Sequence, residues 1–446
     1  MSMLGELLIE EDLAAPSAPD LPEIITVGEQ VAPAAPPDTA STGIDPAVLG
    51  DLALKLAYTV PSFTTEWAAR QLRLPVPLVA DLLDQLKTDK LVEILGQTGP
   101  LSYRCTITNR GREQATRLLE VSGYIGPAPV SLASYAAMLE WQLARAPALS
   151  PQDVSDALSE LVLPDEAIQV AGMAIFSGRS LFVFGPAGNG KSSVGRMLHN
   201  ALRGEIWIPY CISVEPNIIR VFDPGCHHPV ELACEEPWTI DHRWVRIRRP
   251  LIVVGGELTI EALDLAYSPA LRYYEAPLHV KSNGGTLLID DFGRQRVDPY
   301  ELLNRWIIPL EHQIDHLTLR TGQKVEVPFR QMLVVATNLD PSEVTDPAFL
   351  RRMGYRLHLG KPSPERYAQI FERYAQRSGL TVPPGLIDLL FERYRDEGRD
   401  LCCCEPRDLI ERVRDICQLH ARSLELNEQL LDAAWRGYFG ASKSTT

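Results

Sequence analysis

The stretch from Leu181 to Ser193 constrains what this chain can fold into more than any other. Its first four residues are apolar and predict a short buried strand, and the apolar spacing from Val194 to Leu198 predicts a helix. The segment between them is glycine-rich and has the spacing of a Walker A phosphate-binding loop. The loop consists of Gly185, Pro186, Ala187, Gly188, Asn189, Gly190, Lys191, Ser192 and Ser193. Strand, loop and helix in this order predict an α/β fold of the P-loop type.

The residue types of the loop predict its chemistry. Glycines let successive backbone N–H groups point at phosphate oxygens, where the start of a helix adds partial positive charge. Lys191 is expected to reach the β- and γ-phosphates, and the Ser192 hydroxyl to bind Mg²⁺. The sequence therefore predicts a site for a nucleoside triphosphate and Mg²⁺.

Two further strand ends carry polar residues that fit such a site. An apolar run from Gly284 ends in Asp290 and Asp291. We expect Asp290 to be the metal-side carboxylate and Asp291 to be the base that polarises the attacking water. A third apolar run ends in Asn338, whose amide would lie near the γ-phosphate if its strand lies between the other two. The alternative for Asn338 is an asparagine that only caps a loop.

Composition limits the classes of protein to consider. The chain has 446 residues, enough for two or three domains, and a net charge of −15, which argues against non-specific binding to nucleic acid. No apolar run approaches the ~20 residues of a membrane span, and the acidic start lacks the positive charge of a secretory signal. The eight cysteines are therefore expected to be reduced thiols in a cytoplasmic protein that does not insert into membranes.

The first part of the chain changes character at Asp45. Residues 1–44 hold six prolines and no Lys or Arg, which predicts a disordered acidic arm. Four leucines at its start could instead form a docking helix: Leu4, Leu7, Leu8 and Leu13. Residues 45–122 predict three helices, two strands and a closing helix capped by Asn109, an order that resembles a winged-helix domain.

Charge decides how this winged-helix-like segment is interpreted. Residues 45 to 120 hold nine Lys or Arg and nine Asp or Glu, and the third helix, Val76 to Lys90, carries Asp81, Asp84 and Asp89. A surface that reads DNA should be basic, because neutralising phosphates supplies most of the affinity. Protein docking or ring assembly is therefore favoured over binding to nucleic acid.

The order of motifs in the rest of the chain resembles an AAA+ ATPase. The motifs are the phosphate loop, "LLIDD", "VVATN", "FLRRMGYRLHL" and "CEPRDL". Residues 123–149 are expected to be a linker around one short helix, Ser131 to Ala144. The resemblance implies an αβα ATPase core with a five-stranded parallel sheet at 150–362 and a helical lid at 363–446. It also implies ATP as the nucleotide and a ring, expected to be a hexamer.

The same resemblance assigns roles to residues that match the family's motifs. Asn338 matches sensor 1 and Arg407 matches sensor 2. Arg351 or Arg352 matches the arginine finger that is inserted into a neighbouring subunit's ATP. The family's usual second acid is glutamate, so the shorter Asp291 predicts slower hydrolysis rather than lost binding.

Two insertions indicate which branches of the AAA+ family the chain resembles most. About ninety residues separate the phosphate loop from Asp290, more than an α/β unit needs, and a β-hairpin around Thr321 precedes Asn338. Both resemble the MoxR-like and enhancer-binding, or helix-2-insert, branches. "EAPLHVKSNGGTLLIDDFGRQR" and "LLNRWIIPLE" are similar to a bacterial family of predicted chaperone-type ATPases. The function this implies is remodelling or assembly of a protein client by ATP hydrolysis.

Several alternatives stay open at this stage. One is a DNA-binding ATPase that acts in transcription or on mobile elements, and another is a nucleotide-switched scaffold with little hydrolysis. Cys226, His227, His228, Cys234 and His242 could be imagined as a zinc site, although their spacing fits no standard finger. The run Cys402 to Cys404 is either a set of small buried residues or a redox-active group near a helix start.

Overall fold

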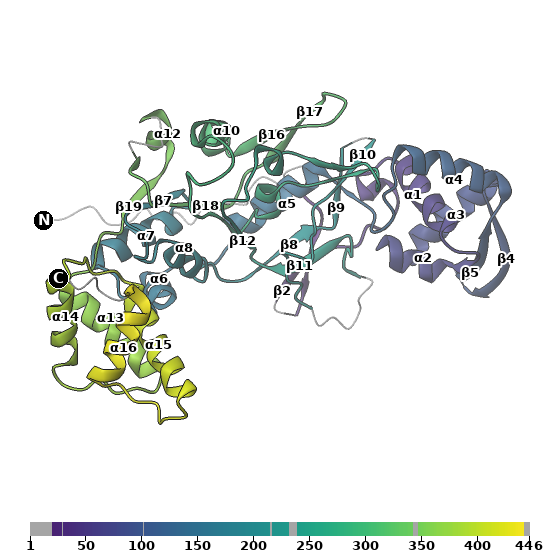
Figure 1. Cartoon of the computed structure of the whole chain (residues 1–446). Helices are drawn as coiled ribbons and strands as arrows, with labels where there is room; N and C mark the ends of the chain where they lie inside the picture. Colours follow the sequence, from purple (N-terminus) through teal and green to yellow (C-terminus); the bar gives the residue numbers. More distant parts are fainter. Residues whose placement is uncertain are drawn as a thin grey trace, which may run out of the picture.

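The computed structural model describes residues 20–28, 30–100, 102–214, 216–231, 239–341 and 347–440. A central α/β core carries one helical unit on each side, formed by the N-terminal part of the chain and by its C-terminal part (Figure 1). The leucines of the proposed docking helix, Cys234, and the segment 342–346 before the candidate finger arginines lie outside the described residues.

Within the part of the chain that the structure describes, the core sheet contains five parallel strands, as the resemblance implies. Their order is β12-β15-β18-β7-β19, so the strand that ends next to Asn338 lies between the two strands that lead to the loop and to the acidic pair. The bounds are β12 (Leu251–Val254), β15 (Thr286–Ile289), β18 (Met332–Thr337), β7 (Leu181–Phe184) and β19 (Tyr355–His358). The strands are apolar almost throughout, as a sheet covered on both faces requires.

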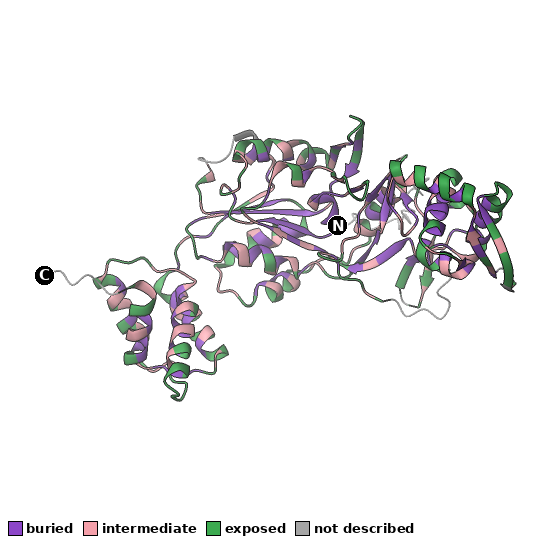
Figure 2. Cartoon of the chain, turned by 45° about the vertical axis from the view of Figure 1, so that its right-hand side comes forward, coloured by how far each residue is buried: buried purple, intermediate pink, exposed green. Residues whose placement is uncertain are grey.

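Helices cover both faces of this sheet, and the strand residues alternate between them. Leu181 and Val183 face one cluster with the helices α6 to α8, whereas Phe182 faces the other with α10 and α12. The buried strands between the two helical layers are visible in Figure 2. The bounds are α6 (Pro151–Leu158), α7 (Asp165–Phe176), α8 (Lys191–His199), α10 (Pro299–His312) and α12 (Pro347–Arg352).

The insertion before Asp290 builds additional β-structure. A mixed sheet has the order β13-β14-β10-β9-β6, and β8 pairs with β11 in a separate ribbon. The short helix α9 (Leu278–Lys281) then leads into β15. The strand bounds are β6 (Val130–Ser131), β8 (Glu205–Pro209), β9 (Cys211–Val214), β10 (Asn217–Arg220), β11 (Trp244–Arg248), β13 (Ala266–Ser268) and β14 (Tyr273–Glu275). The expected hairpin forms from β16 (Ile314–Thr318) and β17 (Lys324–Pro328).

The N-terminal unit contains the helices and strands expected for residues 45–122. They are α1 (Pro46–Tyr58), β3 (Phe63–Thr64), α2 (Thr65–Leu72), α3 (Val76–Thr88), β4 (Val92–Gly99), β5 (Ser102–Ile107) and α4 (Asn109–Val121). One detail differs from the expectation: Thr108, not Asn109, caps α4 by accepting from Gly111 N–H. The strand β4 continues through Gly96 with a register shift.

The expectation that residues 1–44 are disordered is wrong for their described part. The strands β1 (Ile24–Val27) and β2 (Gln30–Pro33) form a hairpin, and Trp207 Nε1 donates to the Val31 carbonyl at 2.9 Å. The buried pair Arg243–Asp241 also holds this segment, because Arg243 donates to the Thr42 carbonyl at 2.9 Å. The hairpin orders because the insertion supplies the apolar surface that the segment itself lacks.

The expected linker at 123–149 is also part of the packed structure. Its helix α5 (Leu132–Ala144) matches the predicted helix, and it buries Tyr135, Met138 and Leu139 against the insertion. Tyr124 and Ala128 belong to the same apolar cluster as the N-terminal helices and Cys211 of β9. The N-terminal unit and the insertion therefore share one core.

The C-terminal helical unit contains α13 (Pro364–Arg377), α14 (Leu386–Asp396), α15 (Glu405–Leu419) and α16 (Glu428–Phe439). A buried hydrogen-bond chain runs from Tyr367 to Tyr394 (2.9 Å) and from Tyr394 to Glu405 (2.6 Å). This chain fixes the start of α15, where the cysteine run lies. Among the described residues, no helix combines the length and apolarity needed to cross a bilayer.

Candidate nucleotide site

The candidate site lies where β7, β18 and β15 end. Because parallel strands present their carboxyl ends at the same edge of the sheet, the loop after β7, Asn338 after β18 and the acidic pair after β15 come together. This edge is where open α/β sheets commonly bind ligands.

The loop has a backbone that only glycine adopts without strain at three points. Gly185 has φ +136°, Gly188 has φ +77° and Gly190 has φ +86°, and Gly190 is the N-cap of α8 with no side-chain cap. The first N–H groups of α8 are thus left available for an anion. Lys191 is buried, and its Nζ donates to the Pro186 carbonyl at 2.8 Å. Burial lowers the pKa of Lys191, while the charges of Asp291 and Asp290 oppose this shift.

Ser192 and Asp290 meet as a magnesium site requires. The Ser192 hydroxyl donates to Asp290 Oδ1 at 2.7 Å, although 98 residues separate them in sequence. A hydroxyl and a carboxylate oxygen are the hard oxygen donors that Mg²⁺ prefers. These two side chains therefore fit a magnesium ion shared with nucleotide phosphates.

Asp291 and Asn338 form a second pair at the same edge. Asn338 Nδ2 donates to Asp291 Oδ1 at 3.2 Å. Asp291 has φ +48°, an uncommon conformation for a residue other than glycine. Gln295 Nε2 donates to the Asp291 carbonyl at 3.3 Å and to the Asp290 carbonyl at 3.1 Å, which helps to hold this backbone.

A cavity of about 640 Å³ joins these residues to the C-terminal helical unit. It has the size of pockets that hold small ligands and cofactors. The core contributes residues 187–193, Asp290, Asp291 and Asn338, and the C-terminal unit contributes residues of α13 and the start of α15. Gly185 and Pro186 do not line it but shape the loop: a Cβ on Gly185 would meet the Leu359 carbonyl.

Several lining residues were not singled out from the sequence. Along α13, Arg366, Ile370, Arg373 and Arg377 face the cavity at helical spacing. Arg373 also donates to the Ser159 carbonyl at 2.9 Å, which joins α13 to the segment before α7. The signal that could have found them is the spacing of the three arginines, seven and then four residues apart, which places them on one side of the helix after the core.

The core side of the cavity also holds an apolar group beside the loop. Leu161, Val162, Leu163 and Met197 line it there, and Ile370 lines it from α13. Apolar surroundings of this kind would suit the base of a nucleotide. Arg294 lines the cavity as well.

The three arginines expected to act on the γ-phosphate lie in two places. Arg407 lines the cavity, where it donates to Asp408 Oδ1 at 3.0 and 2.9 Å. Arg351 and Arg352 lie on α12 and are not among the described residues that line the cavity. Arg352 Nε donates to Glu311 of α10 at 2.8 Å, whereas Arg351 is exposed.

Two of the imagined zinc ligands have other partners: Cys226 Sγ lies 3.7 Å from the Asp223 carbonyl, and His227 is bound by the backbone. His227 is buried; its Nδ1 accepts from Asp223 N–H at 3.0 Å and its Nε2 lies 2.8 Å from the Lys281 carbonyl. Both ring nitrogens are thus used by the backbone. Within the described residues, no group of three or more His, Cys, Asp or Glu side chains is arranged to hold a metal.

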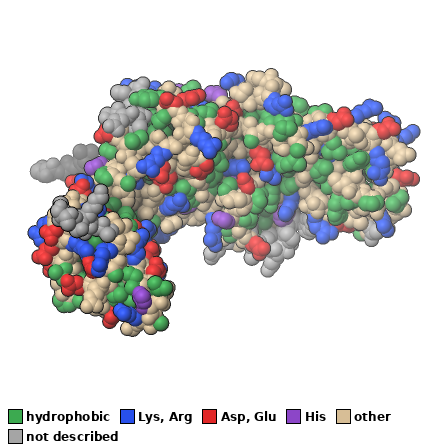
Figure 3. All heavy atoms as spheres, viewed as in Figure 1, with side chains coloured by type: hydrophobic (Ala, Val, Ile, Leu, Met, Phe, Trp, Pro, Cys, Tyr) green, Lys and Arg blue, Asp and Glu red, His purple; other side chains and the backbone are tan. Residues whose placement is uncertain are grey.

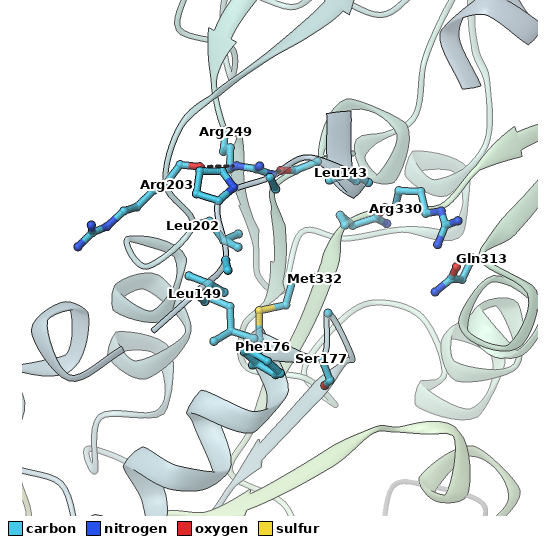
Figure 4. Close-up of a pocket in the computed structure, with 18 of the residues that line it drawn as sticks. Leu143, Leu149, Phe176, Ser177, Leu202, Arg203, Arg249, Gln313, Arg330 and Met332 are labelled. Carbon is cyan, nitrogen blue, oxygen red and sulfur yellow. Dashed lines mark hydrogen bonds between the residues drawn. The ribbon is translucent and has the colours of Figure 1, made fainter. Parts of the chain in front are cut away.

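A second cavity, of about 430 Å³, lies at the opposite edge of the core sheet, where the strands begin. Arg249 donates across it to the carbonyls of Arg203 and Gly284 at 2.9 and 2.6 Å, and Leu149, Phe176 and Met332 line its apolar side (Figure 4). None of the residues expected to bind nucleotide reaches this cavity.

Comparison with known proteins matches one family model, described as "Domain of unknown function (DUF8689)", over residues 363–437. This segment covers the four C-terminal helices. A search of curated proteins found no match.

Solved structures resemble the chain only distantly. A P216G mutant of RuvB from Thermotoga maritima is 14% identical, with a TM-score of 0.38 over 66% of this chain and 74% of that one. NtrX from Brucella abortus in complex with ADP is 14% identical, with a TM-score of 0.37 over 68% of this chain and 56% of that one. The T. maritima RuvB described as a Holliday junction branch migration motor is 16% identical, with a TM-score of 0.37 over 66% and 73%.

These similarities are too weak to carry an argument about activity. The strand order, the glycine loop and the acidic pair are properties of the chain itself. They give it an α/β P-loop fold.

Proposed function

We propose that this chain is an ATPase of the AAA+ class that binds ATP with Mg²⁺ and hydrolyses it to remodel or assemble a protein client. The observation that supports this most is the Ser192–Asp290 contact of 2.7 Å beside the buried Lys191, at the mouth of a cavity large enough for a nucleotide. A chance glycine turn would not bring a distant carboxylate to the first turn of its helix.

In this proposal one set of residues binds ATP and Mg²⁺, and another set promotes hydrolysis. The loop amides and Lys191 hold the β- and γ-phosphates, and Ser192 with Asp290 holds the metal. When bound, Mg²⁺ neutralises charge that develops on the phosphate oxygens. Asp291 accepts a proton from the attacking water, and Asn338 orients the carboxylate through the hydrogen bond it already makes.

The lid would respond to the nucleotide through Arg407. The guanidinium of Arg407 is bound to the carboxylate of Asp408. To contact a γ-phosphate, Arg407 would have to leave this carboxylate and bind the phosphate instead. This exchange would move the start of α15 against the loop. The C-terminal helical unit therefore acts as the lid in this proposal.

A neighbouring subunit would complete the site. Arg351 is the better candidate for the finger, because it is exposed while Arg352 is bound to Glu311 in its own subunit. An arginine acting in trans is worth ~10³-fold or more in rate. This need for a neighbour supports a ring, for which we propose a hexamer.

The N-terminal unit is proposed to dock protein rather than DNA. The exposed side of α3 carries Asp81, Asp84 and Lys87. On the face seen in Figure 3, Lys and Arg side chains of this unit are interspersed with Asp and Glu. Such a surface lacks the positive charge that phosphate binding requires. Salt-dependent binding of this chain to duplex DNA would contradict this part of the proposal.

The test of the proposed function is ATP binding and turnover by the purified chain and its Lys191→Ala variant. Wild type should bind ATP in the presence of Mg²⁺ and release phosphate. Lys191→Ala should lose binding, because the loop loses its only lysine, and its circular dichroism should stay the same. Equal nucleotide affinity of the two proteins would refute the site.

A nucleotide-switched scaffold is the second candidate. It is favoured by the short Asp291, which is held by Asn338 in an uncommon backbone conformation. ATP binding with no phosphate release at any protein concentration would support this candidate over the motor.

A further inference from the structure

Three consecutive cysteines lie between the phosphate loop and α15. Cys402 Sγ lies 3.3 Å from the Ala187 carbonyl oxygen, and Cys403 N–H donates to Asn189 Oδ1 at 3.2 Å. A Cβ placed on Gly188 would lie 2.5 Å from Cys402 Sγ and 2.7 Å from Cys404 Sγ. The two outer sulfur atoms therefore pack directly against the loop.

Only Cys402 and Cys404 face each other. Their sulfur atoms are 3.6 Å apart, whereas Cys403 Sγ lies 4.0 Å from Arg366 Nη2. The backbone between them is a turn: Glu405 N–H donates to the Cys402 carbonyl at 3.2 Å, and Cys402 N–H donates to the Glu405 carboxylate at 3.0 Å. A disulfide needs ~2.05 Å, so the sulfurs must approach by about 1.5 Å, which side-chain rotation can supply.

The two thiols differ in reactivity. The hydrogen bond from Cys402 lowers the pKa of Cys404 to about 7, and the same bond raises the pKa of Cys402. Burial raises the pKa of Cys403. The thiolate is the nucleophile in thiol chemistry, so Cys404 is the group that attacks an oxidant. Cys404 also lines the nucleotide cavity, through which a small oxidant can reach it.

We propose that Cys402 and Cys404 form a reversible disulfide on exposure to a peroxide, and that bound nucleotide prevents this reaction. The second half rests on the proposed function. The Cys404 thiolate attacks one peroxide oxygen, the O–O bond breaks, and the leaving hydroxide takes up a proton to become water. The Cys402 thiol then attacks the resulting sulfenic acid, which releases a second water. Two electrons pass from the two sulfurs to one peroxide, and an external dithiol reverses the change.

Two effects of a bound nucleotide act in the same direction. The nucleotide fills the cavity that Cys404 lines, which blocks approach of the peroxide. Its phosphate charges also raise the pKa of a neighbouring thiol, because like charges disfavour the thiolate. A rise of one unit from about 7 lowers the thiolate fraction at pH 7 about fivefold. Oxidation is thereby slower in the nucleotide-bound protein than in the nucleotide-free protein.

The disulfide itself is tested on the full-length, nucleotide-free chain treated with hydrogen peroxide and then alkylated. We expect a loss of 2 Da in the intact mass before alkylation, two fewer alkyl groups than in the reduced control after it, and one linked peptide that joins Cys402 to Cys404. Cys403→Ser is the matched control and should still lose 2 Da. In Cys402→Ser the reaction should stop at a sulfenic acid on Cys404, which dimedone traps. Cys404→Ser should form neither the disulfide nor the trapped sulfenic acid. A disulfide between chains, or one that survives in Cys404→Ser, would overturn the pairing.

The protection by nucleotide is tested by the rate of thiol loss with and without saturating Mg²⁺ and a non-hydrolysable ATP analogue. Wild type should react at least about fivefold more slowly with the analogue. Lys191→Ala, which is expected not to bind it, should react at the same rate in both conditions. Equal rates in wild type whose binding is saturated by calorimetry would refute the protection. If calorimetry finds no binding, the proposed function and the protection fail together, while the disulfide is still decided by the nucleotide-free experiment.

Discussion

The side-chain amide of Asn338 donates a hydrogen bond of 3.2 Å to Asp291, across the ends of two adjacent strands. Asn338 binds the Oδ1 atom of the Asp291 carboxylate. The backbone of Asp291, at φ +48°, sets the direction in which this side chain leaves the chain. This arrangement gives a short aspartate a fixed position that a flexible side chain would lack.

The first prediction concerns the proposed base. Asp291→Asn should retain ATP affinity within about threefold, because Ser192, Asp290 and the loop remain. Its steady-state phosphate release should fall by ~10²-fold or more, as expected when a general base is lost. The measurement is the ATPase rate at saturating ATP beside a binding titration. Turnover at the wild-type rate would remove Asp291 as the base.

The second prediction concerns the arginine finger. Arg351→Ala should lose more activity than Arg352→Ala, because Arg352 is already bound to Glu311. Mixing Arg351→Ala subunits with Lys191→Ala subunits should restore some turnover, since an intact nucleotide site can then meet an intact finger. We would abandon action in trans if no mixing ratio gave activity above the separate proteins.

The third prediction concerns the contact between the loop and the cysteine run. Gly188→Ala should weaken nucleotide binding at least about tenfold, because its Cβ would lie within 2.7 Å of two sulfur atoms at φ +77°. Gly437→Ala on α16 is the matched control, since nothing lies within 4 Å of the added atom. Binding titrations should separate the two variants, and equal affinities would show that the loop tolerates a side chain there.

The fourth prediction concerns stability. Arg305 of α10 donates to both oxygens of the buried Asp315 at 2.5 and 2.6 Å, and His279 Nε2 lies 2.8 Å from the same carboxylate. Asp315→Asn leaves Arg305 without its charge partner and should lower the free energy of unfolding by about 3 kcal/mol. Urea titrations of both proteins measure the difference, and a difference near zero would contradict it.

The pH dependence of that difference follows from the pKa of Asp315. Its hydrogen bonds from His279 and Arg305 outweigh burial and hold this pKa well below the ordinary 3.8. The stabilisation is therefore complete above 3.8 and is lost as the pH falls toward the folded pKa. The gap between wild type and Asp315→Asn should shrink below pH 3.8, and a constant gap would assign the effect to packing.

Much of the core could be predicted because the residue pattern of each segment favours the same structure that the segment adopts in the fold. The strand at Leu181, the glycine loop and the acidic pair each carry their own signal, and parallel strands bring their ends together. The hairpin at residues 24–33 could not be predicted, because its order depends on Trp207 and the rest of the insertion. The arginines on α13 were missed for a similar reason, since only the fold shows which side of that helix faces the loop.

The shared core of the N-terminal unit and the insertion has a consequence for where this protein can be divided. Tyr124, Ala128 and Cys211 lie in one apolar cluster with the first helices, and β14 of the same insertion is followed directly by α9 and by the strand that ends at Asp290. A truncated chain that begins at residue 150 would expose this surface to water and aggregate. The first helices are therefore packed against the insertion rather than joined to it by a free linker. A displacement of β15, the strand that leads to Asp290, can reach them through α9, β14 and this shared cluster.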